Sequence, residues 1–210
     1  MRIFPVIALF AALVLLVSAD RVESQSLPDE PGTAPLRGPL SIGLSGGQLY
    51  DNFYTTPIYE PWALNMAPSF IVVADVDYRM YHFATLPLQF EAEVNVAKRW
   101  GEAHEFEFIV APYLRWQSFP WNDVLYTNLR VSQLGLSYAT GVSPWERKNS
   151  GNDRGSNFLQ SAGVELTFAP NAHSRIESYI GLHHRSGIYG LIKGVSGGSN
   201  YVIIGFRVFM

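Results

Sequence analysis

The chain contains no cysteine, which removes thiol oxidation from the chemistry open to it. Charged residues are also scarce, at 16% of 210 residues, whereas aromatic residues reach 14%. This balance fits a wall that faces lipid better than a surface that faces water. The formal net charge of -3 does not indicate a nucleic-acid partner. The sequence has no phosphate-binding loop or cofactor motif, so we expect neither a cofactor nor a bound metal ion.

Long apolar runs are missing from the chain except at its start. Arg2 gives a basic beginning, residues 3–17 are apolar apart from Pro5, and residues 17–19 (Val-Ser-Ala) form a small-residue cleavage site. A single membrane-spanning helix is the alternative, but the run is short for one and its end favours cleavage. We therefore expect residues 1–19 to be a signal peptide and the mature protein to lack a transmembrane helix.

Apolar and polar residues alternate through much of the remaining sequence. A side-chain period of two is typical of a β-strand with one apolar face and one ionic face. No helical pattern accompanies these segments to cover their apolar faces. The simplest closed arrangement is a barrel with lipid outside and charge inside. The clearest runs place apolar side chains on even numbers at Phe70, Val72, Ala74, Val76, Leu88, Phe90, Ala92, Val94, Phe106, Phe108 and Val110.

Residues 20–38 are rich in Pro, Ser, Glu and Asp, and we expect them to form a flexible periplasmic lead-in. The rest of the chain predicts an all-β fold, an eight-stranded antiparallel up-and-down transmembrane β-barrel over residues 39–210. An even strand number and long outer loops with short inner turns are typical of bacterial barrels. The strands are expected near residues 39–50, 69–83, 86–99, 104–116, 127–140, 157–169, 173–187 and 200–210.

Odd-numbered strand positions collect charged residues that should point into the barrel. The interior of an eight-stranded barrel is only wide enough for side chains, so we expect a packed ionic interior instead of an aqueous pore. Mutual pairing is required because unpaired buried charges are very costly. The fifth strand changes parity, which predicts a β-bulge near Ser132 and Gln133. The expected interior groups are Asp75, Asp77, Glu91, Glu93, Glu105, Glu107, Glu165, Glu177, Arg79, Arg115, Arg175 and Arg207.

The seventh expected strand ends in a candidate reactive pair, His184 and Ser186. Their spacing puts them on one face, and parity turns that face outward toward the outer leaflet. Polar side chains in this position are unfavourable unless they serve a purpose or lie at the interface. Asn200 on the eighth strand shares the outward parity, so the three side chains are expected to meet across paired strands.

These residue types suit nucleophilic catalysis without a metal. His184 is the candidate base for the Ser186 hydroxyl, and Asn200 is the candidate group that fixes the His184 tautomer. The Gly187 backbone N–H is the candidate oxyanion donor. The alternative is that a His and a Ser at a membrane interface only hydrogen-bond to headgroups or water.

The layout and these residues resemble the PagL-type lipid A 3-O-deacylases and related acyloxyacyl hydrolase-like outer-membrane barrels. That family carries a His-x-Ser pair on the lipid-facing side of the penultimate strand and an acidic orienting residue on the last strand. The resemblance implies that His184 is the base and Ser186 the nucleophile. Two positions differ: the family has asparagine where this chain has Gly187, and its orienter is a glutamate. No acid follows Ser186 here, so Asn200 is the best substitute by position and parity.

Basic residues gather at the expected outer rim and outer loops, which suggests lipopolysaccharide as a partner. Lipid A carries phosphates in that layer, and Arg and Lys bind phosphate well. Every barrel in that leaflet must tolerate phosphate, so the cluster indicates the environment more than a reaction. Its seven members, of fifteen Lys and Arg in the chain, are Lys98, Arg99, Arg147, Lys148, Arg154, Arg185 and Lys193.

The sequence thus favours an outer-membrane esterase of a Gram-negative bacterium that removes an ester-linked acyl chain from lipid A. A different function stays open: the protein could be a non-catalytic barrel with a structural role, or with interactions through residues 51–68 and 141–156. A small-solute channel is a third reading, which the charged interior disfavours.

Overall fold

The structure is a computed structural model that describes residues 37–150 and 152–210. The expected signal peptide, residues 1–19, and nearly all of the expected lead-in, residues 20–38, lie outside the described part of the chain. The described residues belong to one compact unit.

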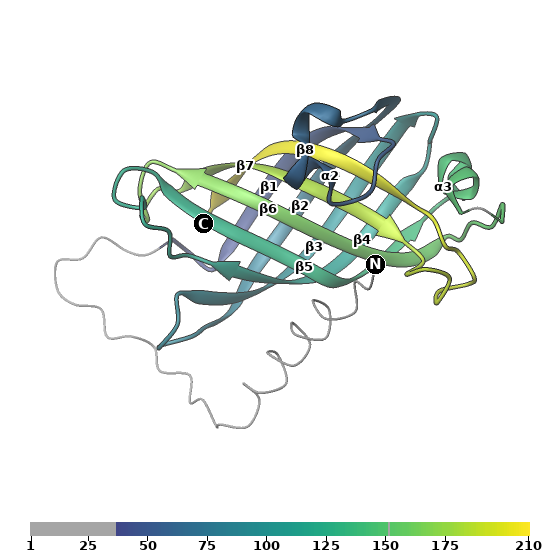
Figure 1. The fold of residues 1–210 in the computed structure, drawn as a ribbon. Coiled ribbons are helices and arrows are strands. Elements are labelled where there is room, and N and C mark those ends of the chain that lie inside the picture. Colours follow the sequence, from purple (N-terminus) through teal and green to yellow (C-terminus); the bar gives the residue numbers. More distant parts are fainter. Residues whose placement is uncertain (1–36, 151) are drawn as a thin grey trace. The chain divides into compact units, whose positions relative to one another are not determined.

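Eight antiparallel strands form a closed barrel in which β1 pairs with both β2 and β8 (Figure 1). Each strand pairs with its neighbours in sequence, which is the predicted up-and-down order, and the observed strands begin and end within three residues of the expected limits. The strands are β1 (Leu40–Tyr50), β2 (Met66–His82), β3 (Leu88–Gly101), β4 (Phe106–Trp116), β5 (Tyr126–Ala139), β6 (Phe158–Ala169), β7 (Ile176–Ser186) and β8 (Gly198–Phe209).

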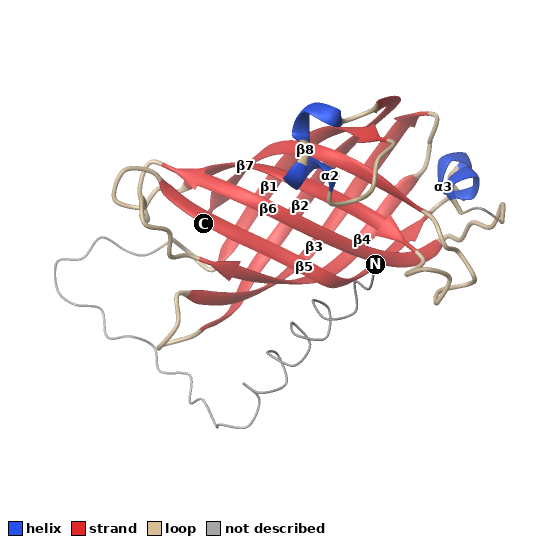
Figure 2. Cartoon of the chain, in the orientation of Figure 1, coloured by secondary structure: helices blue, strands red, loops and turns tan. Residues whose placement is uncertain are grey.

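Three short helices lie in the connections that follow β1 and β5. They are α2 (Thr56–Tyr59), the 3-10 helix η2 (Pro61–Ala63) and α3 (Pro144–Asn149). In Figure 2 α2 lies over the barrel wall near β8 and α3 lies beyond the strand ends. Among the described residues, no helix has the length and apolar character needed to cross a membrane.

The outer wall of the barrel is apolar, as the alternation predicts. Outward-facing side chains on even-numbered positions are exposed while their odd-numbered neighbours are buried. A protein in water would expose a contiguous apolar belt of this extent only at a high cost, so the wall is built for contact with lipid. Exposed members of the belt include Ile42, Leu44, Phe70, Val72, Val76, Val94, Phe108, Val110, Ile180, Ile204 and Phe206.

The predicted bulge in β5 is confirmed, because the pairing of β5 with β6 shifts register between Ser132 and Gly135. The shift exchanges the faces of the strand, so that even-numbered residues before it point inward. Arg130 is therefore fully buried in the barrel. It was not among the expected interior charges, because these lie at odd-numbered strand positions and Arg130 has an even number.

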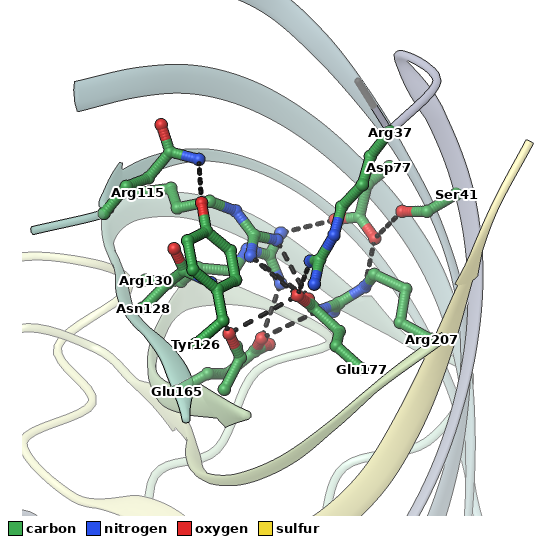
Figure 3. Close-up of polar contacts among 12 residues, drawn as sticks. Arg37, Ser41, Asp77, Arg115, Tyr126, Asn128, Arg130, Glu165, Glu177 and Arg207 are labelled. Atoms are coloured by element: carbon green, nitrogen blue, oxygen red, sulfur yellow. Dashed lines mark hydrogen bonds and ion pairs between the residues drawn. The ribbon is translucent and has the colours of Figure 1, made fainter. Parts of the chain in front are cut away.

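Four arginines and six carboxylates fill the half of the interior that carries the inner turns. Arg130 bonds to Asp77 at 2.5 Å and to Glu165 at 2.5 Å (Figure 3). It also bonds to Glu91 at 2.7 Å. Arg115 and Arg207 both reach Glu177, at 3.1 and 3.2 Å. The guanidinium groups of Arg115, Arg130 and Arg207 each contact carboxylates on at least two other strands, so the network joins the wall across the lumen as well as along it. The members are Arg37, Arg115, Arg130, Arg207, Asp75, Asp77, Glu91, Glu93, Glu165 and Glu177.

Arg37 closes this network at the end of the barrel. Its guanidinium bonds to Glu177 at 2.6 Å and lies over the Tyr126 and Phe209 rings. Arg175, which we expected inside, is instead exposed at the rim and donates to the backbone carbonyl of Phe209. It precedes the first paired residue of β7, so the inward parity of the strand does not yet apply to it.

A second interior cluster lies toward the outer loops. Arg99 bonds to Glu107 and to Glu146 of α3, and Arg185 also bonds to Glu146. Both arginines are completely buried, so the expectation that Arg99 belongs to a basic rim facing lipid phosphates was wrong. The reason is that α3 folds inward over the barrel end and supplies Glu146 as a buried counter-charge. Arg185 has inward parity on β7 and joins the ionic interior, as that parity predicts.

Side chains fill the described lumen almost completely. An internal cavity lined by Asp75, Glu93, Tyr113, Tyr179 and other residues measures about 10 Å³, which is roughly the space of one water molecule. Asp75, Asp77 and Glu93 bring carboxylate oxygens within 4.8 Å of one another, and each of them is already paired with Arg130 or Arg207. The interior therefore works as a packed core, not as a pore or a metal cage.

Candidate active site

The end of β7 and the beginning of β8 bring the three predicted side chains onto one patch of the outer wall. His184 pairs directly with Asn200, and Ser186 pairs with Gly198. All three candidate side chains are half-buried, whereas the intervening His183, Arg185 and Ser199 point inward and are buried. The Nδ1 atom of His184 lies 2.5 Å from the Oδ1 atom of Asn200.

The contacts of Asn200 fix which nitrogen of His184 carries a proton. The Asn200 Nδ2 donates to the backbone carbonyl of Asn52 at 2.9 Å, so its Oδ1 faces the imidazole as an acceptor. Nδ1 must then be the protonated nitrogen, and Nε2 keeps its lone pair. This is the tautomer that a general base on Nε2 requires.

Ser186 is close to His184 in sequence and on the same face, but it is bonded elsewhere. Its Oγ donates to the Oε1 of Gln160 on β6 at 3.4 Å. Among the described residues, no hydrogen bond joins Ser186 to His184. A serine hydroxyl changes direction by rotation about one bond, and catalytic hydrogen bonds are often long before substrate binds. The pair is thus adjacent but not engaged.

Gly187, the candidate oxyanion donor, follows β7 directly. Its N–H donates to the carbonyl oxygen of Gly197 at 3.4 Å, so it is not a free donor in this structure. At that length the bond is weak, and a negatively charged oxygen is a better acceptor than a neutral carbonyl.

The loop after β1 covers the His184 side of the patch. The Tyr54 ring packs against the His184 ring with their centroids 4.5 Å apart. Tyr50 has outward parity on β1 but is completely buried, and its hydroxyl donates to the Tyr54 carbonyl at 2.8 Å. Burial raises the pKa of the Tyr54 hydroxyl above its usual range, so this group stays protonated.

Three neighbours of the site were not predicted from the sequence: Gln160, Asn52 and Tyr54. Gln160 did carry a signal, because it is a polar residue with outward parity on a lipid-facing strand. Asn52 and Tyr54 belong to a loop with no periodic pattern, so only the folded chain reveals their contacts with Asn200 and His184.

Two outer loops next to the site present exposed basic side chains. Ser196 donates to the Ser150 carbonyl and Asn152 donates to the Gly194 carbonyl, which ties the loop after β7 to the loop after β5. This pairing places positive charge beside the end of β7. The exposed basic residues on the two loops are Arg147, Lys148, Arg154 and Lys193.

Comparison with known proteins finds similarity in structure only. No protein-family model matches the sequence, and no curated protein matches it. Among solved structures, the outer membrane enzyme PagL matches with a TM-score of 0.57 and 8% sequence identity, covering 81% of this chain and 99% of that chain. Neisserial surface protein A (NspA) matches with a TM-score of 0.45 and 13% identity, covering 81% and 96%. The likeness to PagL is one of fold: a closed, all-antiparallel barrel of eight strands.

Proposed function

We propose that this protein is an esterase of the outer membrane of a Gram-negative bacterium that removes an ester-linked acyl chain from lipid A. The observation that carries the proposal is the 2.5 Å contact between His184 and Asn200, which leaves the His184 Nε2 unprotonated on the lipid-facing wall beside Ser186. A lone His and Ser at an interface would not need a third side chain that selects this tautomer.

In the proposed reaction Ser186 is the nucleophile and His184 transfers its proton. The Ser186 Oγ turns from Gln160 to His184, gives its proton to Nε2 and attacks the carbonyl carbon of the ester. The tetrahedral intermediate then expels the sugar alkoxide, which takes the proton from Nε2. A water molecule next gives a proton to Nε2 and attacks the acyl-serine. The second tetrahedral intermediate breaks its bond to the Ser186 Oγ, which takes the proton back from Nε2, and the fatty acid leaves.

Asn200 and Gly187 assist this reaction in different ways. Asn200 orients the imidazole through a neutral hydrogen bond, which stabilises the positively charged intermediate form of His184 less than a carboxylate would. The Gly187 N–H exchanges its long bond to Gly197 for the developing oxyanion. We expect a slower enzyme than one with an acidic orienter, operating without a metal or cofactor.

The position of the site favours a substrate that diffuses in the membrane plane. His184 and Ser186 open to the outer wall, while the lumen offers no path because ionic side chains fill it. Arg147, Lys148, Arg154 and Lys193 supply positive charge beside the site, and the phosphates of lipid A are the complementary groups in the outer leaflet.

Mass spectrometry of lipid A from cells that express the protein tests the proposal. We expect loss of one acyl chain with the wild-type protein and with Ser178→Ala, which removes an exposed outward hydroxyl elsewhere on β7. Ser186→Ala and His184→Ala should leave lipid A fully acylated. Retention of every acyl chain with the wild type, or the same loss with Ser186→Ala, would contradict the proposal.

A non-catalytic barrel is the second candidate function, and the bond from Ser186 to Gln160 favours it. In that case Ser186 and Gln160 satisfy each other on the wall, and the outer loops at residues 51–68 and 141–156 carry an interaction. This function predicts that Ser186→Ala and His184→Ala change nothing, whereas deletion within either loop abolishes binding to a partner.

A further inference from the structure

The connection between β1 and β2 presents a group of exposed apolar side chains next to the candidate site. We call residues 52–65 the outer-wall arm; it contains α2 and η2. Its exposed apolar residues are Phe53, Ile58, Tyr59 and Trp62, and Trp62 is 82% exposed. Glu60 is the arm's one charged residue. A loop that contacted only water would not expose several aromatic side chains together, because contiguous apolar patches in water are unfavourable.

The outer-wall arm is fixed to the lipid-facing side of the barrel. Asn52 accepts from Asn200 and Tyr54 packs on His184, both of which have outward parity. The base of the arm is closed by hydrogen bonds, from the Asp51 N–H to the Asn65 carbonyl at 2.8 Å and from the Asn65 N–H to the Asn52 Oδ1 at 2.6 Å. In Figure 1 the arm with α2 lies against the barrel wall near β8.

The exposed face of the arm continues the apolar belt of the barrel. The chain leaves the arm directly into β2, where Met66, Phe70 and Val72 are exposed on the outward face. Trp and Tyr prefer the boundary between headgroups and acyl chains, because their rings are apolar and their polar atoms need water. Phe and Ile prefer the acyl layer itself.

We propose that the outer-wall arm is a lipid-docking surface that inserts Phe53 and Ile58 among the acyl chains of the outer leaflet and places Trp62 at the boundary with the headgroups. The proposal rests on the membrane location in the proposed function, but it does not require catalysis. A lipid whose acyl chain lies along the arm would also lie beside His184, since Tyr54 joins the two. The arm would then deliver acyl chains to the lipid-facing site.

The absence of cysteine from the chain makes a single-site probe possible. Phe53→Cys and Ile58→Cys change exposed side chains of the arm and can each be labelled with an environment-sensitive fluorophore. The labelled protein is reconstituted in phosphatidylcholine vesicles. Fluorescence is measured with aqueous iodide and, separately, with lipids that carry a nitroxide on the acyl chain. We expect blue-shifted emission, loss of intensity with the nitroxide lipid and little loss with iodide.

Two control positions separate the arm from the location of the barrel. Ile204→Cys lies on the apolar belt of β8 and should respond only to the nitroxide lipid. Lys148→Cys replaces an exposed charged residue of α3 and should respond to iodide. Quenching of both arm probes by iodide, with the Ile204 probe still in lipid, would overturn lipid docking alone and would indicate an aqueous partner. Iodide quenching of the Ile204 probe would overturn the proposed membrane location together with the arm.

Discussion

At the scale of single residues, the site depends on a chain of two hydrogen bonds that ends in a backbone group. The Asn52 carbonyl sets the direction of the Asn200 amide, and the Asn200 amide sets the protonated nitrogen of His184. Neither bond involves a formal charge. A neutral hydrogen bond contributes about 0.5–1.5 kcal/mol, so the loss of either bond should lower kcat by about tenfold or less.

Asn200→Ala removes the acceptor for the His184 Nδ1–H and frees the ring to adopt the other tautomer. We expect kcat for ester hydrolysis to fall by about tenfold, whereas Asn200→Asp, which retains an acceptor, should stay well above the alanine variant. Steady-state release of fatty acid by purified protein in detergent measures both. Equal rates for Asn200→Ala and the wild type would show that Asn200 does not orient the base.

Tyr54 is expected to position His184 by packing on its ring. Tyr54→Leu loses the aromatic contact and should lower kcat by about fivefold, the rate equivalent of about 1 kcal/mol. Tyr54→Phe retains the ring and should restore wild-type hydrolysis. The idea fails if the Phe and Leu variants are equally slow while both remain folded on unheated gels.

Parity alone predicted that His184, Ser186 and Asn200 share the outward face, because the period of a strand is two and neighbouring strands keep that period in register. The same rule could not predict the bond from Ser186 to Gln160 or the contact between Tyr54 and His184. Those depend on side-chain rotamers and on a loop whose path is set by the folded barrel. The chemical roles of the three residues remain predictions.

At the scale of elements, one bulge turns a central arginine of the ionic network into the interior. The register shift between Ser132 and Gly135 turns Arg130 inward, where it contacts Asp77, Glu91, Glu93 and Glu165. The sequence predicted the bulge from the parity change but did not predict this consequence, because the inward charges were assigned from odd positions.

Arg130→Ala should leave four buried carboxylates without their shared partner. Removing one member of a buried ionic group costs about 3–5 kcal/mol, so the free energy of unfolding should fall by that amount. Arg175→Ala is the matched control, since Arg175 is exposed and donates to a backbone carbonyl; its cost should stay below about 1 kcal/mol. Urea titration of the barrel in detergent, followed by gel mobility, measures both. Equal stability of the two variants would contradict the account of the network.

The helix α3 shows what strand patterns leave undetermined. Glu146 on this short helix pairs with Arg99 and Arg185, which the sequence had assigned to the basic rim. The strand positions of both arginines were correctly predicted to be near the outer end. The strand residue Glu107 contacts both arginines, but one carboxylate does not balance two buried guanidinium groups. Their second shared partner, Glu146, comes from a loop that strand parity does not describe.

At the scale of the whole molecule, the distribution of side chains is inverted relative to a water-soluble protein: ionic groups fill the centre and apolar groups cover the wall. This arrangement seals the lumen and leaves the outer wall as the surface that meets other molecules. Reconstituted protein should give no steady conductance in planar lipid bilayers, because the internal cavity among the described residues has room for about one water molecule. Stable ion channels in such recordings would contradict the packed interior.

The most direct test of the proposed site is covalent capture of its nucleophile. Purified protein is treated with a long-chain alkyl fluorophosphonate, which reacts with serine only where a base activates the hydroxyl. Mass spectrometry should find one adduct on Ser186 in the wild type and in Ser178→Ala, and none in His184→Ala. Wild-type protein that stays unlabelled, or labelling of Ser186 that persists in His184→Ala, would contradict an activated serine on the outer wall.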